Sequence, residues 1–518
     1  MIIPAPKLNP LFLEKIASVV GTRGYSIADK DRLSYSRDAN FRSTIKAHYL
    51  IYETFPSIIV WPENAEQISK IIKICLKHKI PIITYGGGSG VCAGALPLSR
   101  SLMLDVKRLK TFIRLDEDKL FAEADAGILG LELEKKLSRK GYTLGHFPVS
   151  ILNATLGGYV ATRAAGQRSS KFGKIEDMII DLEFVDGKGR IWQTSDVSRT
   201  RGLNVTELIV GSEGTFGIIT KVKLKVFPNG AYRTFRAYSF TNLNYGLEAQ
   251  RRIIQTGMKP DILRLYDKLD TAIYFSKMSS TGLPLTELPF DIPTNVKKLL
   301  RLLKSGAIFM LFRYQKLVQK AANMSWLGCM MISMLEGPEE LCQTKQNIIH
   351  SICKDMGARD MGERVAQHWF QHRFSVPFKI PKMFQNGGFT DTVEVTTTWD
   401  NVERLYNGVL KKLSANCLVF THISHIYTDG VSIYFSFVAP LKGPQNSVIS
   451  YDHIWQSALD AIQEFGGILS HHHGIGRQKT AHIVHEWADA MVVYKHTKNF
   501  FDPHKILNPG VLVESKKD

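Results

Sequence analysis

The sequence predicts an α+β protein with more than one domain, and three observations support this prediction. At 518 residues, the chain is longer than a single hydrophobic core usually allows. Its composition, 44% hydrophobic and 22% charged, is that of a folded globular protein. Helical apolar spacing and short β-branched runs alternate along the chain, which is typical of mixed helix and sheet.

Residues 1–228 are expected to form the first domain. One helix is predicted from Asn64 to His78, where apolar residues recur at helical spacing. Another is predicted from Ile128 to Lys140, which has basic residues in its last turn and stops at Gly141. The strands predicted here are Ile80–Tyr85, Leu102–Val106, Phe121–Ala124, Met178–Asp186, Ile191–Thr194 and Gly217–Val226.

Residues 229–470 are expected to form a second, α+β domain that handles the substrate, and residues 471–518 to return to the first domain. The strands predicted in the second domain are Cys329–Leu335, Phe389–Thr396, Leu418–Ser424 and Ser432–Phe437. The helices predicted there are Leu247–Thr256, Pro338–Asp355, Trp399–Leu413 and Tyr451–Phe465.

The formal net charge of +18 indicates partners that carry phosphate or other negative charge. Zinc fingers, an RNP-type strand and a leucine zipper are absent from the sequence, so we do not expect nucleic-acid binding. Six cysteines without CxxC spacing argue against a zinc site or a disulfide scaffold and suit a reducing compartment. The sequence shows neither a signal-peptide layout nor a membrane-spanning stretch, and we therefore expect a cytoplasmic protein.

One segment, residues 292–335, combines seven lysines and arginines with short apolar runs and lacks Asp and Glu. Basic residues flanking an apolar core are typical of a segment that lies on an anionic membrane surface. The alternative is a pair of amphipathic helices that pack on the second domain while their lysines are solvated. The sequence does not decide between these two alternatives. Peripheral membrane contact through this segment is the hypothesis that makes the more specific prediction.

A glycine-rich loop, Gly86-Gly87-Gly88-Ser89-Gly90, directly follows a predicted strand. Glycines let a backbone approach phosphate closely and turn with φ > 0, so the loop predicts phosphate binding, with a tight turn as the simpler alternative. It is neither a Rossmann nor a P-loop motif, because no helix pattern and no Gly-Lys-Ser/Thr follow it.

Three further segments rich in small residues accompany this loop: 145–166, 171–177 and 211–220. Small residues in all of them would let an extended cofactor lie along several backbone strands. Together with the loop, they resemble the vanillyl-alcohol oxidase superfamily of FAD-binding proteins over nearly the whole chain. The resemblance implies a two-subdomain FAD-binding fold with an α+β substrate, or cap, domain.

Four motifs are most similar to the alkyldihydroxyacetonephosphate synthase family within that superfamily. They are the segment from Gly145 to Asp177, Arg264 in Leu-Arg-Leu-Tyr-Asp, Tyr434, and the run His471-His472-His473. The resemblance implies that Tyr434 moves a proton beside the flavin and that Arg264 and the histidines serve catalysis. Alternate side chains of a strand point oppositely, so three adjacent histidines in a strand cannot all face the site, and we expect one or two of them to reach substrate.

The resemblance implies FAD held without a covalent link, and the loop agrees because it contains no histidine that could bond the flavin. The loop would hold the pyrophosphate, residues 150–155 and 162–165 the flavin ring, and residues 213–219 the adenosine half. The implied contacts are Thr84, Tyr85, Gly86, Gly87, Gly88, Ser89, Gly90, Val91, Ser150, Asn153, Ala154, Thr155, Thr162, Arg163, Ala164, Ala165, Glu213, Gly214, Thr215, Gly217, Ile218 and Ile219.

The substrate is less well defined by these motifs. The family reaction exchanges an acyl group for an alkyl ether in ether-lipid synthesis, whereas related flavoenzymes oxidise 2-hydroxy acids such as D-lactate or glycolate. This chain has Val149 where the synthases carry Asp, and Lys379 or Lys382 where they carry a substrate-binding arginine. Both reactions therefore stay open, as does a binding protein that has lost catalysis.

No metal is expected, although His422 and His425 leave a histidine metal site as an alternative. The partners expected are a small-molecule or lipid substrate and a second copy of the chain in a homodimer.

Overall fold

The computed structural model describes residues 8–194, 204–278, 318, 328–375, 378 and 380–513. The chain divides into two compact units. The first comprises Met1–Gly166, Gly173–Pro228 and His472–Asp518, and the second comprises Gln167–Phe172 and Asn229–His471. The predicted boundaries differ from this division in one respect of consequence: six residues, Gln167–Phe172, belong to the second unit although they lie within the first 228.

The first unit contains a small, mainly parallel sheet in the order β1-β2-β4-β3. Its strands are β1 (Tyr25–Ser26), β2 (Ile58–Val60), β4 (Leu102–Asp105) and β3 (Ile82–Tyr85). The helices that precede or join these strands are α1 (Pro10–Val20), α2 (Asp29–Ser34), α3 (Phe41–His48) and α4 (Ala65–His78). Asn64 starts α4 as predicted, because its side chain accepts a hydrogen bond from the amide of Gln67. The apolar face of α4 packs with α1 and the strands in one core.

A second sheet of the first unit is antiparallel, in the order β5-β6-β10-β8-β9. Its strands are β5 (Phe112–Asp116), β6 (Phe121–Asp125), β10 (Gly217–Lys225), β8 (Ile179–Asp186) and β9 (Ile191–Gln193). The remaining elements between residues 106 and 228 are η1 (Val106–Arg108), α5 (Gly130–Ser138), β7 (Tyr142–Thr143), α6 (Leu156–Ala161), α7 (Ser169–Phe172), α8 (Ile175–Met178), α9 (Val205–Ile209) and β11 (Phe227–Pro228). All of these except α7 belong to the first unit.

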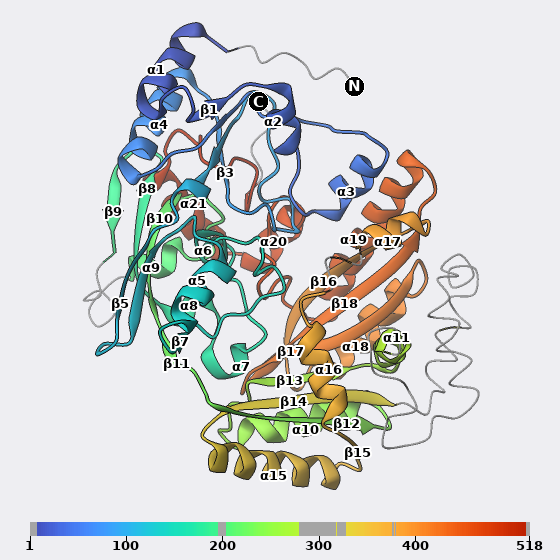
Figure 1. Cartoon of the computed structure of the whole chain (residues 1–518). Coiled ribbons are helices and arrows are strands. Elements are labelled where there is room, and N and C mark those ends of the chain that lie inside the picture. The colour runs from blue at the N-terminus through green and yellow to red at the C-terminus, as the bar shows by residue number, and fades with distance from the viewer. Residues whose placement is uncertain are drawn as a thin grey trace. The chain divides into compact units, whose positions relative to one another are not determined.

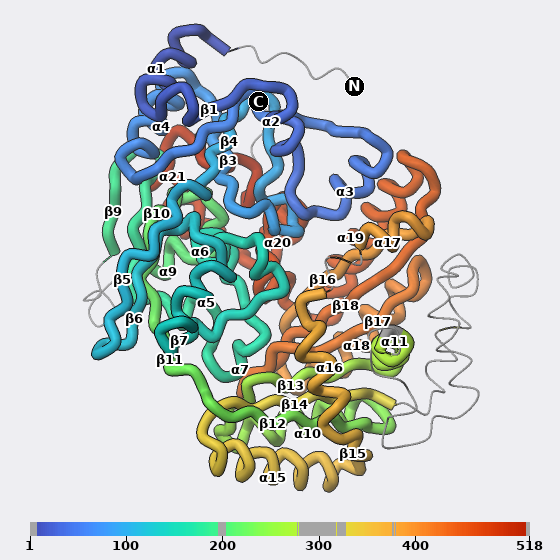
Figure 2. The backbone as a smooth tube through the Cα atoms, in the orientation of Figure 1, coloured from blue at the N-terminus to red at the C-terminus, as the bar shows by residue number. Residues whose placement is uncertain are grey.

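The C-terminal part of the chain completes the first unit with α20 (Thr480–Trp487) and α21 (Ala490–Phe501). Figure 2 shows this red tube running back among the blue and cyan N-terminal part of the chain. Beyond α21, Leu507 forms a parallel bridge with Ile82 in β3, and the amide of Asn508 donates to the carbonyl of Ile82 at 2.9 Å. Leu507 and Asn508 therefore lie beside the strand that leads into the glycine loop.

The second unit is built on one seven-stranded antiparallel sheet, in the order β15-β12-β14-β13-β17-β18-β16. Its strands are β12 (Tyr232–Phe240), β13 (Ile262–Tyr266), β14 (Cys329–Gly337), β15 (Arg359–Gly362), β16 (Gly388–Thr398), β17 (Leu418–Ile426) and β18 (Gly430–Pro440). Its helices include α10 (Leu243–Gln255), α11 (Lys268–Met278), α15 (Glu339–Asp355), α16 (Arg364–His372), α17 (Ile380–Gln385), α18 (Val402–Leu413) and α19 (Pro444–Glu464). Figure 1 shows α10 and α15 running along β12 and β14. The predicted α+β character is confirmed.

The segment 292–335 lies almost entirely outside the described residues. Its last residues form part of β14, whose side chains are buried from Cys329 to Glu336. The membrane hypothesis for the rest of the segment stays a prediction. Among the helices that the structure describes, none is both long and apolar enough to cross a bilayer. All six cysteines are buried and unbridged.

A buried ion network explains why Gln167–Phe172 belongs to the second unit. Arg168 donates from Nε to Asp261 at 3.0 Å and from a terminal nitrogen to Glu336 at 2.9 Å. Lys171 donates to Asp261 at 3.1 Å and to the carbonyl of Glu336 at 2.6 Å. The amide of Glu336 itself donates to Asp261 at 2.8 Å. These partners are nearly a hundred residues or more away, so local sequence patterns carry no sign of them.

We expect the substitution Arg168→Met to lower the free energy of unfolding by about 3–5 kcal/mol, because the buried carboxylates of Asp261 and Glu336 then lose the positive charge of Arg168. Urea-induced unfolding of the wild type and the variant measures this difference. Arg251→Met is the matched control, since Arg251 pairs with Glu248 on the partly exposed surface of α10. An exposed pair contributes about 1 kcal/mol or less. Equal losses in the two variants would contradict the structural role of the network.

Candidate functional site

The glycine loop lies at the carboxyl edge of the parallel sheet in the first unit. Tyr85 at the end of β3 pairs with Asp105 at the end of β4, so the segments that follow these two strands leave the sheet at the same edge. Lys107, on the second of these segments, donates to the carbonyl of Gly86 at 2.8 Å and to Asp105 at 2.7 Å. This edge of a parallel sheet is where such folds bind ligands, and Lys107 places a positive charge there. Sequence reasoning missed Lys107 as a member of the site.

The loop packs closely on the segment that was predicted to line the flavin. A methyl group on Gly87 would lie 1.6 Å from the carbonyl oxygen of Asn153, and one on Gly86 would lie 2.3 Å from Oγ1 of Thr155. Gly88 has a φ of +62°, which favours glycine. The loop and residues 153–155 are thus brought together by the fold, and only glycine fits at the point of closest approach.

Two buried polar atoms near this loop have no hydrogen-bond partner among the described residues. Oγ1 of Thr84 and Oδ1 of Asn508 are buried and accept no hydrogen bond from the described residues. The two side chains converge on Gly214, where a methyl group would lie 3.5 Å from Oγ1 of Thr84 and 3.9 Å from Nδ2 of Asn508. Buried polar atoms are rarely left without a partner. These atoms, the glycine cradle and Lys107 fit a bound dinucleotide.

Asn508 is a second residue that sequence reasoning missed. Its Nδ2 donates to the carbonyl of Glu213 at 2.7 Å and to that of Gly94 at 3.0 Å, and its φ of +42° is unusual outside glycine. Asn508 stands in an Asn-Pro-Gly turn motif, and the sequence predicts only that residues 471–518 return to the first domain. No local signal in the sequence joins it to residue 213.

The other residues of the first unit that were predicted to contact FAD have different surroundings. Arg163 directs its side chain to Glu176, with 3.6 Å between the charged atoms, and Ala164 and Ala165 are buried. The hydroxyl of Thr215 donates to the carbonyl of Ser212 at 2.6 Å. The side chain of Ile218 lies in the hydrophobic core with the residues of α4. The contact of these residues with FAD stays a prediction.

Glu213 uses its carboxylate for hydrogen bonds within the protein, and its contact with FAD stays a prediction. It accepts hydrogen bonds from the amides of Ile475 at 2.7 Å and Gly476 at 2.9 Å, and so holds the turn after the histidine run. Burial raises the pKa of this carboxyl to about 7, and the two amides act in the opposite direction. Folding therefore favours the protonated form between the ordinary pKa of 4.5 and about 7.

This shift predicts a pH-dependent difference between the wild type and Glu213→Gln. The contribution of Glu213 to stability is fully present below pH 4.5 and is lost as the pH rises through about 7, because the charge is then buried. The corresponding change is roughly 3 kcal/mol at most. We expect the melting temperature of the variant to rise relative to the wild type between pH 5 and pH 8, as measured by calorimetry. A difference that is constant over this range would contradict the prediction.

In the second unit, polar side chains form a row across four neighbouring strands. Tyr266 pairs with His422, His422 with Tyr434, and Tyr434 with Glu394, so that all four residues share one face of the sheet. The register of β17 shifts between Ile423 and His425, and His425 then pairs with Ser432. A bulge of this kind brings His425 to the same face as His422, although residues three apart in a regular strand point oppositely.

Tyr434 lies at the centre of this row. Its hydroxyl is 2.9 Å from Nε2 of His425, and its ring stacks on His422 with centroids 4.6 Å apart. His422 in turn lies 3.0 Å from Asp270. Burial raises the pKa of the Tyr434 phenol well above its ordinary value, the carboxylate of Glu394 adds to this, and Arg264 acts in the opposite direction. The phenol is neutral in this setting and needs a neighbour to exchange its proton.

Arg264 lies on β13, and its guanidinium carbon is 5.0 Å from the centre of the Tyr266 ring and 5.6 Å from that of Trp369. Its Nε is buried and has no hydrogen-bond partner among the described residues. A guanidinium that lies near two aromatic rings and has an N–H donor without a partner among the described residues can bind an anionic substrate group. Of the two predicted substrate lysines, Lys382 is exposed on α17 and Lys379 lies outside the described residues.

The histidine run does not form a strand, so the expectation of a strand here is wrong, while the number of histidines that reach substrate stays a prediction. Residues 471–473 form a bend, with left-handed φ values at Gly474 and Gly476 directly after it. The amide of His471 donates to both oxygens of Glu394, at 2.7 and 3.0 Å, which ties this residue to β16. His471 is the last residue of the second unit, and His472 and His473 begin the return to the first.

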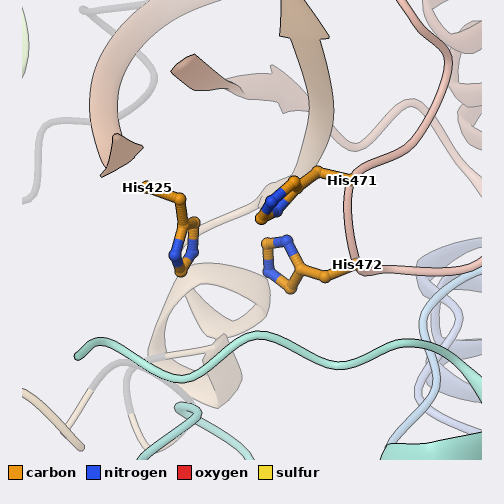
Figure 3. A group of neighbouring side chains, drawn as sticks. All are labelled: His425, His471 and His472. Atoms are coloured by element: carbon orange, nitrogen blue, oxygen red, sulfur yellow. The ribbon is translucent and has the colours of Figure 1, made fainter. Parts of the chain in front are cut away.

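The imidazole rings of His425 and His471 lie side by side, with centroids 5.1 Å apart (Figure 3). They belong to a histidine group of the kind that can hold a metal ion. In this structure, however, His425 uses Nδ1 toward Ser169 at 2.7 Å and Nε2 toward Tyr434 at 2.9 Å. Nε2 of His471 is 2.9 Å from the hydroxyl of Tyr427. These nitrogens serve a hydrogen-bond network, and that no metal binds here stays a prediction.

Comparisons with known proteins agree with this architecture. The family model described as FAD linked oxidases, C-terminal domain, matches residues 231–512, and the model described as FAD binding domain matches residues 56–195. The chain therefore belongs to the FAD-linked oxidases, and it is an FAD-dependent enzyme. The predicted superfamily and fold are confirmed.

Two relatives and one solved structure are similar to this chain over most of their length. The chain is 26% identical to alkyldihydroxyacetonephosphate synthase of Dictyostelium discoideum, over 100% of this chain and 83% of the relative. It is 24% identical to the glycolate oxidase subunit GlcD of Bacillus subtilis, over 96% and 95% of the two chains. A solved structure of alkyldihydroxyacetonephosphate synthase superposes with a TM-score of 0.77 at 23% identity, over 98% of this chain and 86% of the other. This structural likeness shows the fold.

Proposed function

We propose that this enzyme exchanges the acyl group of an acylated dihydroxyacetone phosphate for the alkyl chain of a long-chain alcohol. The observation that carries the proposal is the cluster on the sheet of the second unit. There, Tyr434 and His471 meet in one hydrogen-bond network, and Nε of Arg264 on the same sheet has no hydrogen-bond partner among the described residues. These are residues that match the synthase motifs, and the likeness to the Dictyostelium synthase extends over the whole chain.

The exchange needs groups that hold an anion and move a proton. The bond from carbon to the acyloxy oxygen breaks and the fatty acid leaves as a carboxylate, while the alcohol oxygen forms a new bond to carbon and loses its proton. Tyr434 is positioned to carry that proton, and Arg264 to bind the phosphate. FAD, when bound, supplies a nucleophilic ring nitrogen in its reduced state. No net oxidation takes place.

The FAD in this proposal is bound non-covalently. The groups that support it are the glycine cradle, Thr84, Lys107 and Asn508, none of which forms covalent flavin bonds. Acid precipitation of the yellow protein tests this point. We expect the flavin in the supernatant, and yellow colour retained in the pellet would contradict non-covalent binding.

A second candidate is the oxidation of a 2-hydroxy acid. It is favoured by the likeness to the glycolate oxidase subunit and by the lysine in place of a substrate-binding arginine. An anaerobic experiment separates the two. Fatty-acid release from an acylated dihydroxyacetone phosphate in the presence of hexadecanol, without loss of flavin colour in D-lactate or glycolate, supports the exchange. Bleaching of the flavin by a hydroxy acid, without fatty-acid release, supports the oxidation and overturns the first proposal.

A lipid substrate would give a reason for membrane contact through residues 292–335. Binding to vesicles of anionic phospholipid, compared between the full chain and a variant in which the lysines and arginines of 297–320 are changed to glutamine, tests this part. Equal binding of the two proteins would contradict it.

A further inference from the structure

The residue that orients His425 comes from a distant part of the chain. Ser169 lies on α7, within the six residues that the ion network of Arg168 fastens to the second unit. Its hydroxyl is buried and lies 2.7 Å from Nδ1 of His425, while Nε2 of the same ring lies 2.9 Å from the hydroxyl of Tyr434. A single buried imidazole thus bridges the phenol of Tyr434 and Ser169, a residue that was not among the predicted site residues.

The hydrogen bonds around Ser169 allow the proton of His425 to reside on Nδ1. Tyr427 donates its hydroxyl to Oγ of Ser169 at 3.4 Å, and the Tyr427 oxygen lies 2.9 Å from Nε2 of His471. A serine oxygen can accept two hydrogen bonds. With Tyr427 donating on one side, Oγ can accept the proton of Nδ1 of His425 on the other. Nε2 of His425 is then the nitrogen without a proton, and it faces the Tyr434 phenol.

We propose that Ser169 is a positioning residue, which holds His425 in the tautomer with the proton on Nδ1, and that His425 exchanges a proton with Tyr434 during the reaction. The phenol proton moves from the Tyr434 oxygen to Nε2 of His425, which becomes an imidazolium; the Tyr434 phenolate then takes the proton that the alcohol loses, and the proton on Nε2 leaves to solvent with the release of the carboxylate. The Nδ1–H bond to Ser169 is kept throughout. This inference rests on the role of Tyr434 in the proposed function. It adds His425 as the group that takes the proton from a phenol whose pKa is raised.

Among the described residues, the charged and titratable groups that face this pair come from several elements. Tyr434 faces Glu394 from β16, Arg264 from β13, and His422 and His425 from β17, and the phenol of Tyr427 also acts on it. His425 also faces His471 and Ser169. Removal of the Ser169 hydroxyl changes none of these charges. A shift in the pH profile of the Ser169→Ala variant therefore reports on the coupling of His425 to Tyr434 and not on a change in the surrounding field.

The first test is kinetic and uses the FAD-loaded enzyme. We expect Ser169→Ala to lower kcat about tenfold or more, with KM and flavin content unchanged, and to move the apparent pKa of the kcat profile. Ser169→Thr keeps the hydroxyl and should restore most of the rate. Ser170→Ala, one residue along α7, is the matched control and should behave as the wild type. Wild-type kcat and pH profile in Ser169→Ala, while Tyr434→Phe has lost turnover, would overturn the inference and leave the proposed function intact.

The second test does not depend on turnover. Ring ¹⁵N chemical shifts of histidine-labelled protein, with His425 assigned through a His425→Gln variant, report which ring nitrogen carries the proton. We expect the proton on Nδ1 in the wild type and a mixture of tautomers in Ser169→Ala. A proton on Nε2 in the wild type, or the same tautomer in both proteins, would overturn the inference even if the enzyme proved to act on another substrate.

Discussion

Tyr434→Phe should bind FAD as the wild type does and lose turnover by a factor of about 10²–10⁴, the range that a positioned proton carrier contributes. The substitution removes one oxygen from a buried ring and keeps its stacking on His422. It also removes the partner of His425 at 2.9 Å. The flavin spectrum should not change, since the glycine cradle is built from other residues. Steady-state assays with the substrate that the wild type consumes, together with the visible spectrum, measure both outcomes.

A tyrosine on the surface provides the control for this experiment. Tyr245 on α10 is 49% exposed, and Tyr245→Phe should keep the wild-type rate. The loss in Tyr434→Phe should appear in kcat with little change in KM, because the hydroxyl acts on the proton and Arg264 is left to bind the anion. Turnover equal to that of the wild type would remove Tyr434 from the mechanism. A loss accompanied by a changed flavin spectrum would indicate a structural effect in place of a chemical one.

Gly87→Ala should produce a protein that is purified without flavin. A methyl group at this position would lie 1.6 Å from the carbonyl oxygen of Asn153, so the loop or residues 153–155 must move. Both segments are predicted to contact FAD, and a displacement of either opens the cradle. We expect the ratio of absorbance at 450 nm to that at 280 nm to fall to near the value of the apoprotein, and added FAD to restore little of it.

Gly90 lies three residues further along the same loop and tests whether the effect is specific. A methyl group at Gly90 would meet nothing within 4 Å, so Gly90→Ala should lose far less flavin than Gly87→Ala. Circular dichroism and thermal melting should show a folded protein for both variants. Equal flavin content in the two variants would mean that close packing on Asn153 does not shape the cofactor site. Aggregation of Gly87→Ala alone would show that this packing also supports the fold.

Much of the secondary structure could be read from the chain because its causes are local. The helix α4 begins at Ala65 because Asn64 caps it, and its buried residues recur at the predicted spacing. The strands β3, β4, β8 and β10 lie within one or two residues of their predicted ranges. The histidine run was wrongly expected in a strand, since the bend at 471–473 depends on Glu394 and Glu213, which are far away in the sequence.

The sequence by itself determined the class of enzyme, because a glycine loop after a strand and the matching arginine, tyrosine and histidine motifs are local and ordered along the chain. Only the tertiary structure decided which groups act together. Asn508 reaches the edge of β3, Glu213 holds the turn after the histidines, and Ser169 meets His425 across 256 residues. Such contacts are set by strand register, by a bulge in β17 and by a buried ion network. No periodicity or spacing in the sequence records these features.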